Sequence, residues 1–339
     1  MKQILTHILS LFAFQRKQDW LCSPPISGGA GGGLLSPHFG GSWRGALPLI
    51  VLMLFSCDKQ EITYSGPDYV QWADSLTTLP VVDDEEVFDI RVSAMNTSDR
   101  DRNVAVELIA DKSNAIQGHH FDLLTHTAVI PAGSRTASVR VRAYNSHLEA
   151  NDSIGFILRL LIPESTVSPL YGTETRVMLQ KAKRFDINDF TGYAVVQSTW
   201  MYYYMTPQER LFVVEKDKDV ENRIILRDLY YDNYDVRLDL TSDNILEPKL
   251  HFETQVFAPT TEAFGTIYGN GKIMMDELAA YVSYYSSLEK FICFYTNLYV
   301  TDVGTVGDFV HLIYFVSDEE AKKLLREGID HSQRIKNRE

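Results

Sequence analysis

The sequence predicts a mainly β protein in which a β-sandwich is followed by an antiparallel β-meander or barrel-like domain with one or two short helices. Short runs in which apolar and polar residues alternate recur between residues 69 and 316, and such alternation is typical of strands with one buried face. Turn-forming residues separate these runs at intervals that suit hairpins. With 339 residues and 45% hydrophobic content, the chain is long enough for two such domains.

Residues 1–45 do not fit this pattern. The segment 23–45 is rich in Gly, Pro and Ser, and it has neither the period of a strand nor that of a helix. We expect residues 1–45 to be a disordered or misassigned N-terminal extension that lies outside the folded protein.

An uninterrupted apolar run at residues 46–57 ends in Cys57. As a helix it would be roughly 16 Å long, about half of the ~30 Å hydrocarbon core of a bilayer. Arg44 precedes the run and Asp58 ends it, as in a secretory signal. A buried core helix with a packed cysteine is the alternative. The last four residues of the run resemble the lipobox of bacterial lipoproteins, which implies a lipid on Cys57 that holds the protein to a membrane.

The segment that follows Cys57 is acidic. Four of the 32 basic residues and one of the 45 acidic residues precede Cys57, which leaves a net charge of −16 on the remainder. Nucleic acid is therefore not an expected partner, because phosphate binding needs clustered Lys and Arg. Cys293 is the one other cysteine after Cys57, so no disulfide framework is expected if Cys57 carries lipid.

After a tether at residues 58–68, residues 69–183 are predicted to form the sandwich. The clearest strand places Val139 and Val141 on one face and Arg140 and Arg142 on the other. Similar alternation occurs at 88–94, 104–108 and 154–162. The segments 117–122, 129–133, 138–142 and 149–160 resemble a Calx-beta module, an immunoglobulin-like sandwich.

Calcium-binding members of that family carry adjacent aspartates after the Val/Ile-rich strand. This chain has Tyr144 and Asn145 there, so the resemblance does not imply calcium. Two adjacent histidines, His119 and His120, precede Asp122. Neighbouring strand residues point to opposite faces and rarely chelate one ion, so no metal site is predicted.

Residues 184–328 are predicted to form the second β domain. A capping box at residues 317–320 opens a helix that Gly328 ends, and residues 276–290 fit either a helix or a strand. The tail, 329–339, is polar, and we expect it to fray. The strand candidates are 193–199, 210–215, 223–227, 235–240, 249–256, 264–268, 291–300 and 309–316.

The whole layout resembles that of surface lipoproteins of Bacteroidetes-type bacteria from families of unknown function. The motif that carries this resemblance in the second domain is Phe185, Asp186, Asp189, Phe190, Gly192 and Tyr193. This resemblance implies a lipoprotein at the surface of the outer membrane, with uptake or adhesion proteins as possible partners.

No nucleophile, zinc or phosphate-loop motif occurs in the sequence, so neither an enzyme nor a cofactor is predicted. Two aromatic clusters favour ligand binding. Flat rings cover the apolar faces of sugars, while nearby carboxylates accept hydrogen bonds from the sugar hydroxyls. The candidate residues are Trp200, Tyr202, Tyr204, Tyr230, Tyr231 and Tyr234.

We therefore expect a non-catalytic protein that binds glycan or another nutrient. A structural or adhesive module whose aromatic rings fill its core is the alternative, and a glycoside-acting enzyme comes third because no pair of carboxylates stands out.

Overall fold

The computed structural model describes residues 66–150 and 152–336. The predicted features at residues 1–45, the apolar run at 46–57 and Cys57 lie outside the described residues. Within the described ranges, no helix combines the length and the apolar content needed to cross a membrane.

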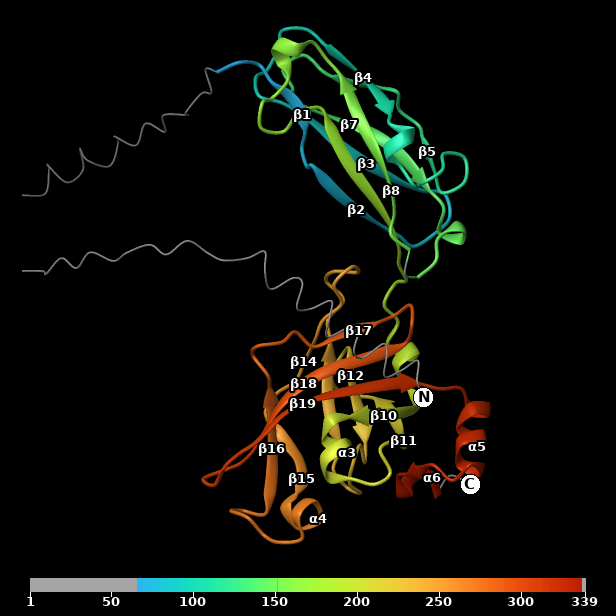
Figure 1. Ribbon diagram of the computed structural model, residues 1–339, viewed down its shortest axis with the longest axis vertical. Coiled ribbons are helices and arrows are strands. Elements are labelled where there is room, and N and C mark those ends of the chain that lie inside the picture. Colours follow the sequence, from blue (N-terminus) through green and yellow to red (C-terminus); the bar gives the residue numbers. More distant parts are fainter. Residues whose placement is uncertain (1–65, 151, 337–339) are drawn as a thin grey trace, which may run out of the picture. The chain divides into compact units, whose positions relative to one another are not determined.

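The N-terminal part is a sandwich of two sheets (Figure 1). One sheet has the order β1-β3-β7-β5, and the other has the order β2-β9-β8-β4-β6, in which β2 runs parallel to β9. The strands are β1 Val70–Trp72, β2 Leu76–Val81, β3 Glu86–Ala94, β4 Arg102–Leu108, β5 Phe121–Leu123, β6 Thr127–Ile130, β7 Thr136–Ala143, β8 Ile154–Leu161 and β9 Glu174–Lys181.

The sandwich core follows the alternation in the sequence. Val139 and Val141 of β7 are fully buried, whereas Arg140 between them is exposed. Phe121 on one sheet stacks on Phe156 of the other, with ring centroids 3.9 Å apart. Short 3₁₀ turns, among them Ala110–Lys112, Asn145–His147 and Glu164–Thr166, connect the strands. This arrangement confirms the predicted sandwich.

A second, larger sheet curls around the core of the C-terminal part. Its strands follow the order β14-β13-β12-β11-β10-β19-β18-β16-β15, so the first and last long strands, β10 and β19, pair with each other. They are β10 Gly192–Ser198, β11 Arg210–Lys216, β12 Arg223–Arg227, β13 Val236–Leu240, β14 Leu250–His251, β15 Gln255–Pro259, β16 Lys272–Glu277, β18 Phe291–Val300 and β19 Gly304–Phe315, with β17 Tyr284–Ser286 on β18 and β20 Asp330–His331 on β11.

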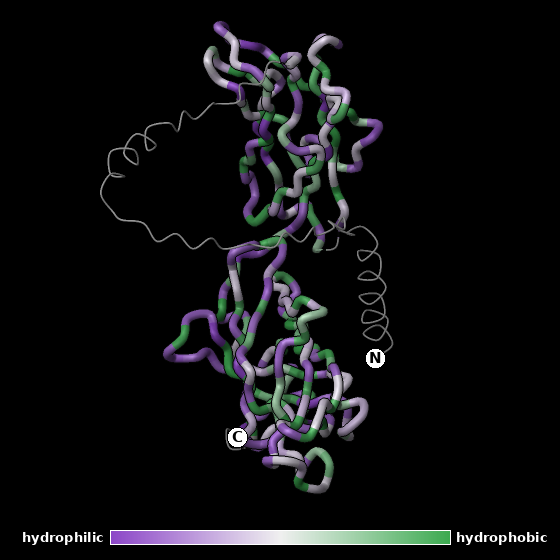
Figure 2. Tube along the Cα trace, turned by 90° about the vertical axis from the view of Figure 1, so that its left-hand side faces the viewer, coloured by the Kyte–Doolittle hydropathy of each residue, from purple (hydrophilic) through white to green (hydrophobic). Residues whose placement is uncertain are grey.

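The sheet is nearly closed. Lys249 beside β14 forms an isolated bridge with Tyr284 of β17, and the Phe252 backbone N–H donates to the Glu277 carboxylate at 2.6 Å. Hydrophobic and hydrophilic residues are interleaved along this part of the chain (Figure 2). Strands β13 and β16 bury alternate residues, as expected when one face lines the core, whereas β10 and β11 bury consecutive residues because Ala321 and Ile335 cover part of their outer face. The predicted barrel-like meander is confirmed.

Four short α-helices accompany this sheet in the described residues: α3 Thr199–Tyr204, α4 Thr260–Phe264, α5 Asp318–Arg326 and α6 Gln333–Lys336. Helix α5 begins as predicted, since the Ser317 hydroxyl accepts a hydrogen bond from the Glu320 N–H, and Ala321 is buried. The other three helices were not predicted.

Of the two alternatives left open for residues 276–290, the structure has the strand, since this segment forms the end of β16, a turn and β17. Two local predictions were wrong. Phe264 ends α4 and residues 265–268 form loop and turn, so 264–268 is not a strand. The tail is not frayed up to residue 336, because β20 pairs with β11 and Ile335 is buried.

The sequence motif at residues 185–193 forms the entry to the curled sheet. The Asp186 carboxylate caps the 3₁₀ helix Ile187–Phe190 by accepting from the Asn188 N–H. Phe190 is fully buried, with its ring edge-on to Tyr285. The motif is therefore explained by packing.

Candidate functional site

Helix α3 divides the first predicted aromatic cluster into a buried and an exposed part. Trp200 has no exposed surface, and its ring packs edge-on against Phe257 and Phe309. Trp200 is therefore a core residue, and its prediction as a ligand-binding residue is corrected. Tyr202 and Tyr204 remain at the surface, 66% and 40% exposed.

Tyr203, 70% exposed, lies between them. Helix α3 is fixed at its start, where the Ser198 hydroxyl accepts from the Met201 N–H at 3.1 Å. The Thr199 hydroxyl accepts from the Val310 N–H of β19, also at 3.1 Å. Two hydrogen bonds thus hold a helix of six residues that presents three successive tyrosines to solvent.

Ring contacts extend this surface to the segment after α4. Tyr204 lies edge-on to Phe264, and Phe264 lies edge-on to Tyr268, with centroid distances of 5.6 and 5.8 Å. Tyr268 is 46% exposed. We call Tyr202, Tyr203, Tyr204 and Tyr268 the tyrosine patch.

The second predicted cluster is not a binding surface. Tyr230 is 2% exposed and Tyr231 9% exposed, and burial raises the pKa of the Tyr231 hydroxyl to about 12. Tyr234 is half-buried and packs against the same core. Tyr230 and Tyr231 therefore support the fold, which corrects their prediction as ligand-binding residues, whereas the prediction for Tyr234 stays a prediction.

The carboxylates beside this cluster are engaged as well. Asp228, 2% exposed, accepts from the Arg334 guanidinium at 2.8 Å. Asp232 pairs with Arg210 at 3.1 Å, and Asp235 pairs with Arg227. Buried charges need such partners. The acidic side chains thus connect the 228–235 segment to β11, β12 and α6.

A buried polar chain crosses the core of the same sheet. The Tyr230 hydroxyl lies 2.5 Å from Nδ1 of His311, and Nε2 of His311 lies 2.9 Å from the Thr296 hydroxyl. His311 is fully buried, and burial lowers its pKa to about 3. The imidazole is therefore neutral at pH 7. Sequence analysis missed this row of hydrogen bonds, because Tyr230, Thr296 and His311 are far apart in the primary structure.

The adjacent histidines His119 and His120 make local contacts, and the His119 ring stacks on His147. His120 Nδ1 accepts from the backbone N–H of Ile116 at 2.9 Å, and Asp122 accepts from the Tyr144 hydroxyl at 2.6 Å. Across residues 66–150 and 152–336, no three His, Cys, Asp or Glu side chains are grouped so that they could hold a metal ion.

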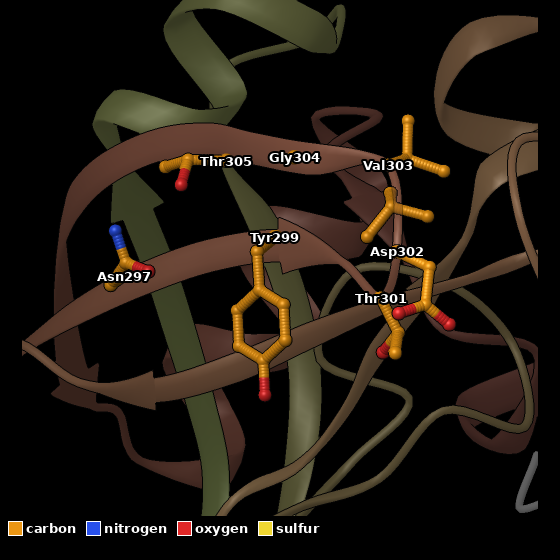
Figure 3. Close-up of a pocket in the computed structure, with 8 residues that line it drawn as sticks. Asn297, Tyr299, Thr301, Asp302, Val303, Gly304 and Thr305 are labelled. Carbon is orange, nitrogen blue, oxygen red and sulfur yellow. The ribbon is translucent and has the colours of Figure 1, made fainter.

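A shallow pocket of about 490 Å³ opens at the β18–β19 hairpin (Figure 3). Asn297 and Tyr299 lie two residues apart on β18 and therefore share a face, while Thr305 lies opposite Tyr299 on β19. The turn adds Asp302 and Thr301. Sequence analysis missed this pocket, although the alternation in the predicted strand 291–300 places Asn297 and Tyr299 on one face.

Known proteins provide limited guidance to function. Residues 170–327 match the family model described as a domain of unknown function, DUF4984. The match confirms the resemblance of the C-terminal part to a family of unknown function. No curated protein matches the chain.

Similar solved structures include a protein of unknown function from Bacteroides ovatus, which is 11% identical over 73% of this chain and 90% of its own, with a TM-score of 0.31. An auxiliary nutrient binding protein from Bacteroides thetaiotaomicron is 11% identical over 71% and 90%, with a TM-score of 0.26. CBD12 from CALX1.2 is 14% identical over 56% and 82%, with a TM-score of 0.28.

Proposed function

We propose that this protein is a non-catalytic, lipid-anchored protein of the cell envelope that binds glycan through the tyrosine patch. One observation carries the glycan-binding part of the proposal: α3 holds Tyr202, Tyr203 and Tyr204 at the surface, with 66%, 70% and 40% of each residue exposed. Clustered exposed aromatic residues of this kind mark binding surfaces in soluble domains.

The chemistry of tyrosine fits a sugar ligand. Its ring covers the apolar C–H face of a pyranose, and its hydroxyl keeps one end in water as a donor and acceptor. The hydrogen bonds of Ser198 and Thr199 hold α3 in place before any ligand arrives. Such preorganisation lowers the entropy cost of binding.

Replacing Tyr202 and Tyr203 together with Ala is expected to weaken glycan binding. At roughly 0.5–1.5 kcal/mol for each ring contact, the loss of two rings corresponds to a drop in affinity of about tenfold or more. The measurement is affinity electrophoresis of the purified protein against a panel of polysaccharides, followed by titration of each polysaccharide that binds.

Tyr171→Ala is the matched control, since Tyr171 is 60% exposed but lies in the sandwich. It should bind like the wild type. If no polysaccharide binds, or if the double variant binds as well as the Tyr171→Ala control, the proposal fails and the structural or adhesive alternative stands.

The anchoring part of the proposal rests on residues 46–57, where an apolar run ends in Cys57. Cells that express the wild-type protein should incorporate an alkyne analogue of palmitate into it, and the labelled protein should fractionate with the outer membrane. Cys57→Ala should abolish the label, because the thiol is the proposed acylation site. Equal labelling of both proteins would contradict it, and Cys293→Ala should leave the label unchanged.

A further inference from the structure

The pocket at the β18–β19 hairpin combines an aromatic ring with hydrogen-bonding groups. Tyr299 is half-buried, and Asn297 lies two residues before it on the same outer face of β18. Figure 3 shows the Tyr299 ring standing between Asn297 and the turn residues Thr301 and Asp302. A flat ring bordered by amide, hydroxyl and carboxylate groups suits a ligand with one apolar face and polar edges.

The β18–β19 hairpin contains an irregularity in its strand pairing beside the pocket. The register between β18 and β19 shifts between Leu298 and Tyr299, so that Tyr299 lies opposite Thr305. Gly304 and Gly307 have φ values of 149° and 151°, a backbone conformation that only glycine adopts without strain. Bulges of this kind re-aim side chains and are frequent beside functional sites.

The neighbouring strand β16 supports this face of the hairpin. Met274 of β16 pairs with Tyr299, and Asp276 pairs with Asn297. Burial and the nearby Asp276 carboxylate raise the pKa of the Tyr299 hydroxyl. The Asp276 carboxylate also accepts from the Thr254 hydroxyl at 2.5 Å. Backbone pairing with β16 thus holds Tyr299 and Asn297 in place, as a preformed binding site requires.

The charges around the pocket restrict the class of ligand. Asp302 is the one charged residue in its lining, which contains no Lys or Arg. Asp308 lies next to the pocket, where its carboxylate accepts from the Asn297 amide at 2.7 Å. Lys272, also on β16, is exposed and does not line the pocket. The Asp302 carboxylate can accept hydrogen bonds from the hydroxyls of a neutral sugar, whereas it would repel the negative charge of a uronate or a sulfate.

We propose that this pocket is a second glycan subsite, separate from the tyrosine patch, that takes an uncharged sugar residue and rejects anionic ones. The proposal rests on the glycan-binding function proposed above and adds to it a site and a substrate class. Tyr299 stacks on the sugar ring, Asn297 donates to its hydroxyls, and Asp302 accepts from them.

The test is titration of the purified full chain with neutral hexasaccharides (cellohexaose, maltohexaose and xylohexaose) and with hexagalacturonate as the anionic probe. We expect Tyr299→Ala to weaken binding of the best neutral probe by about tenfold and Tyr299→Phe, which keeps the ring, by less than threefold. Hexagalacturonate should bind the wild type at least tenfold more weakly than that neutral probe. Asp302→Asn, which suits the left-handed backbone at this position (φ 61°), should narrow this gap.

Tyr314→Ala is the matched control, because Tyr314 is equally a half-buried tyrosine of the β18–β19 pair but lies at its other end. Binding that survives Tyr299→Ala yet falls in the Tyr202→Ala/Tyr203→Ala variant overturns the subsite and leaves the proposed function standing. If glycan binding is lost in Tyr299→Ala but not in the Tyr202→Ala/Tyr203→Ala variant, the subsite is supported and the tyrosine patch is overturned as a binding site. Hexagalacturonate binding as tight as that of the neutral probe overturns the substrate class.

Discussion

Replacing Trp200 with Ala is expected to lower the free energy of unfolding by about 3–5 kcal/mol, the usual cost of deleting a fully buried large aromatic side chain. Trp200 is entirely buried, and its ring contacts Phe257, Phe264 and Phe309, which come from β15, α4 and β19. These rings close the core beneath α3, so a cavity there should loosen the helix as well. Urea unfolding followed by far-UV circular dichroism measures the change.

Tyr203→Ala, three residues along the same helix, is the matched control. Its side chain is 70% exposed, so its removal should change the free energy of unfolding by less than about 0.5 kcal/mol. If Trp200→Ala unfolds like the wild type but loses glycan binding, Trp200 belongs to the surface, as the sequence alone suggested.

This pair of residues shows what the sequence could and could not predict about the site. Trp200 and Tyr202–Tyr204 form one aromatic run, from which the sequence analysis took Trp200, Tyr202 and Tyr204 as candidates without separating buried from exposed rings. The division into core and surface depends on a helix of six residues, α3, that begins at the Ser198 cap. A helix this short leaves no periodic pattern in the sequence, so the buried and exposed rings could not be told apart.

The strands were easier to predict because each depends on local alternation. Strands β12 and β18 lie exactly where the sequence predicted them, at Arg223–Arg227 and Phe291–Val300. Residues 276–290 are different: their apolar spacing fits a helix, but Tyr285 instead lies in β17 and packs on Phe190, almost a hundred residues earlier. Tertiary packing here overrides local pattern.

The tail was mispredicted for an electrostatic reason. It is polar, which favours fraying, yet Asp330 pairs with the buried Arg210 and Arg334 pairs with the buried Asp228. Both partners lie more than a hundred residues away. The sequence shows that Asp330 and Arg334 are charged, but only the fold shows that they neutralise the buried charges of Arg210 and Asp228.

Acidification is expected to destabilise the protein through His311, even before its carboxylates titrate. Burial lowers the pKa of His311 from 6.5 to about 3 in the folded state. Since the unfolded chain takes up the proton first, the stabilisation is complete above pH 6.5 and is lost as the pH falls from 6.5 towards 3. Between pH 8 and pH 5 the loss amounts to about 2 kcal/mol, which urea unfolding at each pH measures.

The His311→Gln variant separates the pH dependence of stability that comes from His311 from that of the other titratable groups. Glutamine does not titrate, and its amide can still serve both the Tyr230 and Thr296 hydroxyls, which lie against the two ring nitrogens in the native protein. The variant is expected to be less stable at pH 8, because the stacking of His311 on Phe294 is lost, but its stability should fall by about 2 kcal/mol less between pH 8 and pH 5. Groups such as Asp189, whose pKa is lowered by Lys183 and Lys290 against the opposing effect of burial, are common to both proteins and cancel in the difference. Equal pH dependence in the two proteins would mean that His311 is protonated within the fold, and that water reaches the Tyr230–His311–Thr296 chain.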